Sequence, residues 1–182
     1  MRKSREEAAK TRERIVSAAA SEFRRNGIVA TGLADLMAAA GLTHGGFYKH
    51  FESKDKLVAD ATTAAMDDLL EGMAAHPTKS SAVAAYLSTR HRDNPGSGCP
   101  LAAIGSELSR SDKRTREAGT AGFVRLVDML AGKAGTAAAR RRALVAAATM
   151  IGAMTMSRMI TDPELSAEIL REAEKSLTAA RS

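Results

Sequence analysis

Residues 31–57, TGLADLMAAAGLTHGGFYKHFESKDKL, constrain the fold of this chain more than any other stretch. Apolar residues at positions 33, 36, 37 and 40 recur at helical spacing and predict a short amphipathic helix. Gly41 follows where a helix ends in a left-handed residue, and Thr43 is a good N-cap whose hydroxyl would accept a hydrogen bond from a free backbone N–H. Phe47 and Phe51, four residues apart, then face inward. The stretch therefore predicts two helices joined by a glycine turn, a helix-turn-helix.

The second of these helices, near 43–51, would direct polar side chains outward. A helix in the major groove of DNA needs some donors aimed at base edges and others that hold phosphates. His44, near the amino end, is the best candidate base reader, and Gly45 and Gly46 would let the backbone approach the groove. Ser53 caps the next helix, where Lys54 adds positive charge to free N–H groups. We therefore predict DNA contacts from Thr43, His44, Gly45, Gly46, Tyr48, Lys49, His50 and Lys54.

Residues 6–60 resemble the DNA-binding domain of the TetR family of bacterial transcriptional regulators. The resemblance rests on TRERIVSAAASEFRRNG from position 11, AAGLT from position 39 and GGFYKHFESKDKL from position 45. It implies a three-helix DNA-binding domain over 1–55, followed by a helical effector-binding and dimerisation domain over 56–182. It also implies that Tyr48, His50 and Lys54 touch the DNA backbone or groove. The chain departs from the family pattern at Gly32 and Ala34, where a hydroxyl residue and an arginine often reach DNA.

Composition agrees with an all-α fold. Alanine is abundant, and no alternating run of β-branched residues is bounded by hairpin turns. A net charge of +6 is consistent with nucleic-acid binding. The amino terminus lacks a secretory signal and no apolar run could cross a bilayer, so we expect a cytoplasmic protein without membrane contact.

Enzymatic and metal-binding functions find little support in the sequence. A single cysteine excludes an intrachain disulfide and any multi-cysteine metal site. His44 and His50 are six residues apart, which does not place them on one helical face. No nucleophile elbow or phosphate loop appears. We therefore expect no catalytic activity, no metal and no cofactor.

Further helices are predicted over about 5–26, 54–75, 79–92, 100–110, 112–132, 137–160 and 163–180, with all four prolines at helix ends. Basic residues gather at the leading end of the first helix. They form either a solvated surface or additional phosphate contacts, and the sequence leaves both readings open for Arg2, Lys3, Arg5, Lys10, Arg12 and Arg14.

The last two helices carry apolar stripes. One stripe comprises Leu144, Ala148, Ile151, Thr155 and Met159, with Gly152 allowing close approach, and the other comprises Leu165, Ile169, Ala173 and Leu177. Both stripes could be buried within one subunit. Because a helix-turn-helix dimer reads two half-sites, and because related proteins dimerise through their final helices, we expect a homodimer through 137–160 and 163–180 on a palindromic operator.

The body would bind an effector that the sequence does not identify. Pockets in helical bodies are mostly apolar, so the candidate lining residues are Met66, Leu70, Tyr86, Leu101, Ile104 and Phe123, each of which is equally suited to plain core packing. The resemblance implies a repressor that a small ligand releases from DNA. A sequence-blind architectural DNA-binding protein is the alternative, but it would leave the last two thirds of the chain without a purpose.

Cys99 suggests a different alternative, a repressor that responds to oxidants or electrophiles. Pro100 suits the first position of a helix, which puts Cys99 at the N-cap. There the helix dipole would stabilise a thiolate and lower the pKa of the thiol. The other interpretation is a small buried residue that packs well.

Overall fold

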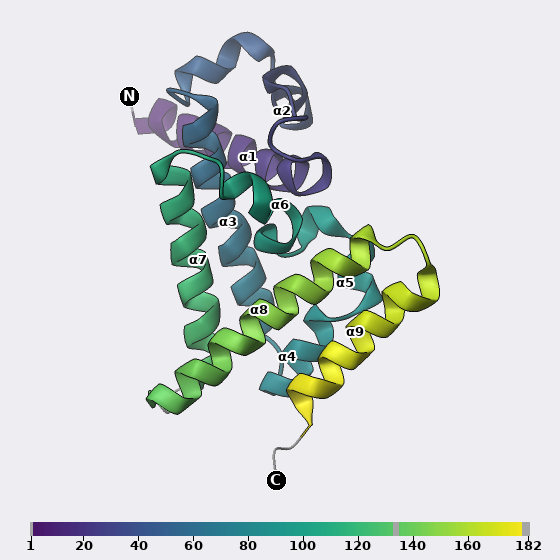
Figure 1. Ribbon diagram of the computed structural model, residues 1–182. Helices are drawn as coiled ribbons and strands as arrows, with labels where there is room; N and C mark the ends of the chain where they lie inside the picture. The colour runs from purple at the N-terminus through teal and green to yellow at the C-terminus, as the bar shows by residue number, and fades with distance from the viewer. Residues whose placement is uncertain (1, 133–134, 180–182) are drawn as a thin grey trace.

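The computed structural model describes residues 2–132 and 135–179, with side chains from residue 5 onward. Every regular element in these ranges is helical (Figure 1). In chain order the elements are α1 (Arg2–Asn26), α2 (Leu33–Ala39), the 3₁₀ helix η1 (His44–Lys49), α3 (Lys54–Ala74), α4 (Lys79–Tyr86), α5 (Thr89–Asp93), the 3₁₀ helix η2 (Pro95–Ser97), α6 (Pro100–Leu108), α7 (Lys113–Ala131), α8 (Ala137–Met159) and α9 (Pro163–Thr178). Within the described residues, no helix combines the length and apolar character needed to span a membrane.

Helices α1 and α2, η1 and the start of α3 enclose a first apolar cluster. Ile15, Ala19 and Phe23 of α1 are buried, and α1 ends at Gly27, whose φ of 86° is left-handed. Gly41 ends the α2 turn in the same way, with a φ of 68°. Gly41 thus ends its helix as the sequence predicts.

A second apolar cluster fills the remaining part of the chain. It includes Met66, Leu126, Met150, Met154 and Leu170. Helix α3 belongs to both clusters, because Leu57 to Ala65 face the first and Met66 to Met73 face the second. Helix α7 lies alongside α3, while α8 and α9 pack against each other further from α1 (Figure 1). One long helix therefore links the helix-turn-helix to the body.

The predicted helix over 79–92 is wrong, because the chain forms two helices there. Leu87 leaves the helical region with φ −87° and ψ 28°, and Ser88 caps α5 by accepting a hydrogen bond from the backbone N–H of His91. Helix α6 also departs from a regular helix at Ile104, where φ is −129°. The other predicted helices match to within a few residues at each end.

Side chains at the end of α1 and in α6 join the helix-turn-helix to the body. Arg24 is buried and its Nη1 donates to the carbonyl oxygen of Gly98, 2.9 Å away. Glu107, at the end of α6, accepts hydrogen bonds from the backbone N–H groups of Ile28 and Val29, each at 2.9 Å. The turn between α1 and α2 is thus bonded to the body through a carboxylate.

Candidate nucleic-acid interface

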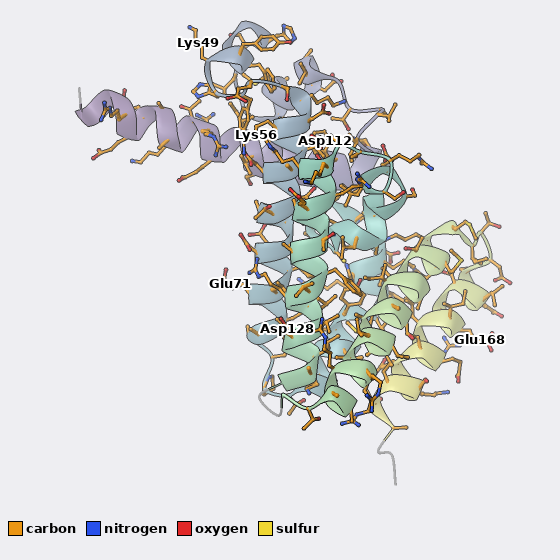
Figure 2. All side chains as sticks on the ribbon, turned by 60° about the vertical axis from the view of Figure 1, so that its left-hand side comes forward. Lys49, Lys56, Glu71, Asp112, Asp128 and Glu168 are labelled. Carbon is orange, nitrogen blue, oxygen red and sulfur yellow. The ribbon has the colours of Figure 1, made fainter. Side chains whose placement is uncertain are left out.

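The segment after Thr43 exposes several polar side chains, while its two phenylalanines are buried in the apolar core. Phe47 is fully buried and stacks on Phe51 with ring centroids 5.7 Å apart. Tyr48, next to it, is 69% exposed, and its ring is nearly perpendicular to that of Phe47, with ring centroids 5.1 Å apart. His44 and Lys49 are also exposed, and His50 is half-buried. Figure 2 shows Lys49 at the end of the molecule furthest from Asp128 of α7.

This segment is a 3₁₀ helix, whereas the sequence predicts an ordinary helix capped by the Thr43 hydroxyl. Thr43 occupies the N-cap, but its side chain makes no capping bond. Its carbonyl accepts from the N–H of Gly46 at 3.0 Å, as 3₁₀ geometry requires. Gly45 and Gly46 each disfavour an α-helix by ~1 kcal/mol, which accounts for the short, tight form.

The side chain of Lys54, whose charge was predicted to contact DNA, is bonded within the chain. Its Nζ donates to the carbonyl oxygens of Ile28, at 2.6 Å, and Thr31, at 2.7 Å. In this conformation the ammonium secures the α1–α2 turn and is not free for a phosphate. The first turn of α3 still offers its backbone N–H groups, with Ser53 capping it through a bond from the N–H of Lys56.

Two of the basic residues of α1 also have structural partners. Arg12 forms an ion pair with Asp60 and lies over the ring of Phe51, 4.8 Å from its centroid. Arg14 donates to the carbonyl oxygen of Ala40 at 2.6 Å. Arg5 and Lys10 are exposed, whereas the side chains of Arg2 and Lys3 lie outside the described part. At the start of α2, the exposed Gly32 and Ala34 have no side-chain donor.

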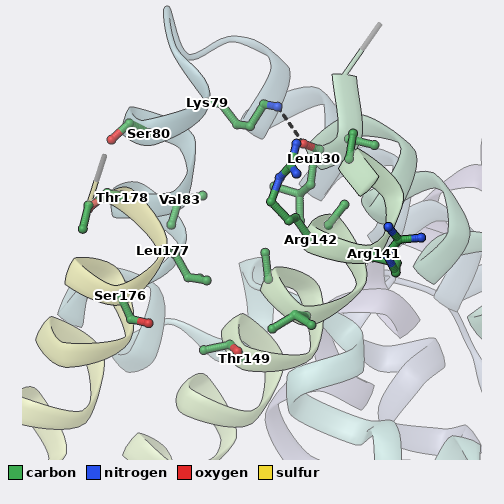
Figure 3. Close-up of a pocket in the computed structure, with 16 residues that line it drawn as sticks. Lys79, Ser80, Val83, Leu130, Arg141, Arg142, Thr149, Ser176, Leu177 and Thr178 are labelled. Carbon is green, nitrogen blue, oxygen red and sulfur yellow. Dashed lines mark hydrogen bonds between the residues drawn. The ribbon is translucent and has the colours of Figure 1, made fainter. Parts of the chain in front are cut away.

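The predicted effector residues pack as core in this structure. Met66, Leu70 and Tyr86 are buried in the second cluster, and Leu101 and Phe123 pack against it. Ile104 belongs instead to the first cluster, against which Leu101 also packs. A cavity of about 760 Å³ lies elsewhere, between α4, α7, α8 and α9 (Figure 3), and none of these six residues lines it. The sequence feature that could have pointed to this cavity is the pair Arg141 and Arg142, which line it, although such charges also fit a solvated helix face.

Cys99 occupies the N-cap of α6, with Pro100 after it, as predicted. The predicted lowering of the thiol pKa is wrong. The side chain of Cys99 is fully buried, and burial raises the pKa of its thiol. The Tyr86 hydroxyl and backbone groups of α6 offset only part of this rise in pKa.

The surroundings of Cys99 are fixed by His91. The Cys99 N–H donates to His91 Nε2 at 2.8 Å, so the imidazole is neutral and its Nδ1–H donates to the Tyr86 carbonyl at 2.6 Å. Arg158 of α8 donates from Nη2 to the His91 carbonyl at 2.9 Å. Among the described side chains, no group of three or more His, Cys, Asp or Glu is placed to hold a metal ion.

Comparison with known proteins identifies the helix-turn-helix. Residues 15–61 match the family described as bacterial regulatory proteins, tetR family. The HTH-type transcriptional regulator TtgR of Pseudomonas putida is 43% identical over 58 residues, which are 32% of this chain and 28% of TtgR. The chain therefore aligns with little more than a quarter of that curated relative.

Two solved structures resemble this chain over both the helix-turn-helix and the helical body. A TetR-family transcriptional regulator from Agrobacterium tumefaciens has a TM-score of 0.74 at 22% identity, over 94% of this chain and 100% of that one. The reduced form of Escherichia coli NemR has a TM-score of 0.73 at 20% identity, over 93% and 95%. Both the helix-turn-helix and the helical body thus follow one known architecture.

Proposed function

We propose that the chain is a transcriptional repressor that binds operator DNA as a homodimer and is released by a small effector, because its helix-turn-helix matches the tetR family of bacterial regulatory proteins and its whole fold resembles that of a TetR-family regulator. As a DNA-binding regulator it would act in the cytoplasm, where bacterial DNA lies. No enzymatic role is proposed, since its relatives are named as transcriptional regulators.

The observation that carries the proposal is the exposed edge of η1 above the buried Phe47 and Phe51. We assign base contacts to His44 and contacts with phosphates or the groove wall to Tyr48, Lys49 and His50. Thr43, Gly45 and Gly46 would let the backbone approach the groove. For Lys54 we propose a phosphate contact only from its backbone N–H, at the start of α3, because its ammonium is bonded within the chain.

The dimer is supported by apolar side chains left uncovered on the last two helices. Helix α8 buries Ala139, Ala143, Ala147, Met150 and Met154 in its own subunit. On its other side Val145 and Met159 are 64% and 63% exposed, and Leu144 and Met156 are also exposed. Leu165 of α9 is 43% exposed. We propose that a second copy covers this face, because two-fold symmetry would pair the same apolar patch with itself.

Two residues of the predicted α8 stripe have partners in their own subunit, and one of them, Ile151, packs against the second cluster. The Thr155 hydroxyl donates to the carbonyl oxygen of Ala102, at 3.1 Å, and so faces α6. Of the second predicted stripe, Ile169, Ala173 and Leu177 are half-buried, and Ala173 and Leu177 pack against the second cluster. The proposed contact is therefore centred on Met156 and Met159.

The division into a DNA-binding domain over 1–55 and a body over 56–182 also remains a proposal. It is supported by the two apolar clusters, which meet within α3. Since α3 contributes to both, a displacement of α3 within the body would move the helix-turn-helix. An effector that favours one position of α3 would then change the affinity for DNA.

Sensing through Cys99 is the second candidate for the signal. It is favoured by the likeness to NemR, whose structure is described as a reduced form. The burial of the thiol and its raised pKa oppose it, since the thiolate is the reactive species. We therefore give the small-ligand hypothesis precedence.

Selection of binding sites from randomised duplex DNA tests the proposal. The purified protein should enrich a palindrome whose half-sites lie about one helical turn, ~10 base pairs, apart. Tyr48→Ala should fail to enrich it. Enrichment of no sequence, with affinity that falls steeply with salt for every duplex, would instead support the sequence-blind architectural protein.

A further inference from the structure

The cavity between α4, α7, α8 and α9 has a charge pattern that core packing does not explain. Its lining includes three cationic side chains and no acidic one: Lys79, Arg141 and Arg142. Lys79 Nζ donates to the carbonyl oxygen of Leu130 at 2.7 Å, and Figure 3 shows Arg142 extending toward the same place. One end of the cavity is thus strongly positive.

This concentration of charge is unfavourable in the protein alone. Arg140, Arg141 and Arg142 follow one another near the amino end of α8, so three like charges lie close together and repel one another. Arg140 forms an ion pair with Asp128 of α7. Among the described residues, Arg141 and Arg142 have no carboxylate within ion-pair distance. An anion in the cavity would supply the missing negative charge.

The rest of the lining is mostly apolar, with a few hydroxyl groups. Val83, Leu130, Ala143, Ala146 and Leu177 provide the apolar surface, and Thr149 and Ser176 add hydroxyls. Figure 3 shows Val83 and Leu177 on one side of the cavity, facing α8 on the other. A volume of about 760 Å³ lies within the range of small-molecule sites. An occupant would therefore carry an apolar body behind its anionic head.

We propose that this cavity binds an amphipathic anion, a carboxylate or phosphate joined to an apolar body, and that this molecule is the effector. The second part rests on the proposed function. The anionic head lies against Arg142 and Lys79, and the apolar body lies between Val83, Ala146 and Leu177.

Helix α7 connects the cavity to the helix-turn-helix. Leu130 and Ala131, at its end, line the cavity. Along its length α7 packs on α3, so closely that a Cβ on Gly122 would lie 2.5 Å from Cγ of Met66. At its start, the Thr115 hydroxyl lies 3.5 Å from the carbonyl oxygen of Asp55, in the first turn of α3. A ligand that shifts the end of α7 would thus act on α3 at its middle and at its first turn.

Isothermal titration with decanoate tests the binding site, with decan-1-ol and acetate as matched probes that lack the charge or the apolar body. Decanoate should bind, and each of the other two should bind at least tenfold more weakly. Arg142→Gln should weaken decanoate binding about tenfold, since a hydrogen bond to a charged group is lost. Arg142→Lys should restore part of the affinity, and Arg140→Gln, one residue away from the lining and outside it, should leave it unchanged.

A second variant guards against misfolding as the cause. Ala146→Phe would fill the apolar part and abolish decanoate binding, while the thermal melt monitored by circular dichroism stays cooperative. Equal affinity for decanoate and decan-1-ol, or an Arg142→Gln protein that binds decanoate normally, would overturn the anion site. Loss of dimers in Arg142→Gln with unchanged decanoate affinity would overturn it too, by assigning the charge to the subunit contact.

Operator binding separates this inference from the proposed function. If the selected palindrome is bound and decanoate weakens that binding only when Arg142 is intact, the effector assignment stands. If the palindrome is bound but decanoate does not bind the protein, the ligand class is wrong while the regulator remains. If decanoate binds but no DNA sequence is selected, the proposed function fails and only the binding site is retained.

Discussion

The carboxylate of Glu107 lies 2.9 Å from the backbone nitrogen of Ile28, so the end of α6 is bonded directly to the turn between α1 and α2. The same carboxylate oxygen accepts from the next N–H along the chain. From the other side Lys54 binds two carbonyl oxygens of this turn. A movement of α6 in the body would therefore be transmitted to the position of α2 and η1.

Replacing Glu107 tests this connection. Glu107→Ala leaves two backbone N–H groups without their acceptor and should lower the free energy of unfolding by about 1–3 kcal/mol. Glu107→Gln keeps one acceptor oxygen and should cost less. Urea unfolding measures both, with the exposed Glu117→Ala of α7 as a control that should change little. If Glu107→Ala were as stable as the control, the two hydrogen bonds would not contribute to the free energy of unfolding.

Two neighbouring aromatic residues should separate DNA binding from stability. Tyr48→Ala removes an exposed ring and should weaken operator binding about tenfold or more with the free energy of unfolding unchanged. Phe47→Ala empties a fully buried site and should cost about 3–5 kcal/mol. Fluorescence anisotropy of labelled operator and urea unfolding measure the two effects. A Tyr48→Ala protein with full affinity for its operator would show that η1 does not enter the groove.

Local signals in the sequence were sufficient for much of the fold. The inward Phe47 and Phe51 follow from their spacing, and the stops at Gly27 and Gly41 follow from the freedom of glycine to adopt positive φ. The cap at Ser53 was also predictable, because its partner Lys56 is three residues away. Each of these features depends on neighbours along the chain.

Features that depend on distant residues were missed. Lys54 is near the amino end of a helix in sequence, but its ammonium meets carbonyls more than 20 residues earlier. Cys99 has the predicted N-cap position, yet packing against Tyr86 and α6 buries it and raises the pKa of its thiol. The cavity beside Arg142 forms only where four separate helices meet. Periodicity along one helix carries no information about these partners.

The close approach of α7 to α3 leads to a prediction at Gly122. A Cβ there would lie 2.5 Å from Cγ of Met66, so Gly122→Ala forces the two helices apart and should destabilise the protein by about 1–3 kcal/mol. Gly72→Ala on α3 is the matched control, since a Cβ there meets nothing within 4 Å. The control should be more stable by up to ~1 kcal/mol, because alanine favours the helix. Thermal unfolding compares the two, and a Gly122→Ala protein as stable as the Gly72→Ala protein would contradict the close contact.

Stability should fall as the pH drops below that at which unfolded histidine titrates. Burial lowers the pKa of His91, and the charges of Arg158 and Arg24 act in the same direction, against the opposing hydrogen bond to the Tyr86 carbonyl. The folded state thus binds the proton less readily than the unfolded chain. The stability contributed by neutral His91 is present above about pH 6.5 and is lost as the pH falls toward the lowered folded pKa.

Urea unfolding of the wild type and of His91→Gln at pH 8 and pH 5.5 measures this contribution. The wild type should lose more stability between the two pH values than the variant, which has no imidazole to protonate. The exposed His76→Gln is the control and should follow the wild type. Identical losses in wild type and His91→Gln would show that His91 titrates alike in the folded and unfolded states.

The dimer contact can be tested without disturbing the protomer, because Gly152 of α8 faces open space. Within one chain a Cβ on Gly152 meets nothing within 4 Å, and the neighbouring Met156 is 41% exposed. Gly152→Arg should therefore fold with the stability of a single subunit but place a bulky charge in the proposed contact, giving monomers in sedimentation velocity. Gly72→Arg introduces the same side chain on α3, also into open space, and should remain dimeric. Since two half-sites are read by two subunits, the Gly152→Arg monomer should bind a full palindrome no more tightly than a single half-site. A Gly152→Arg protein that sediments as a dimer and retains tight operator binding would place the subunit contact elsewhere.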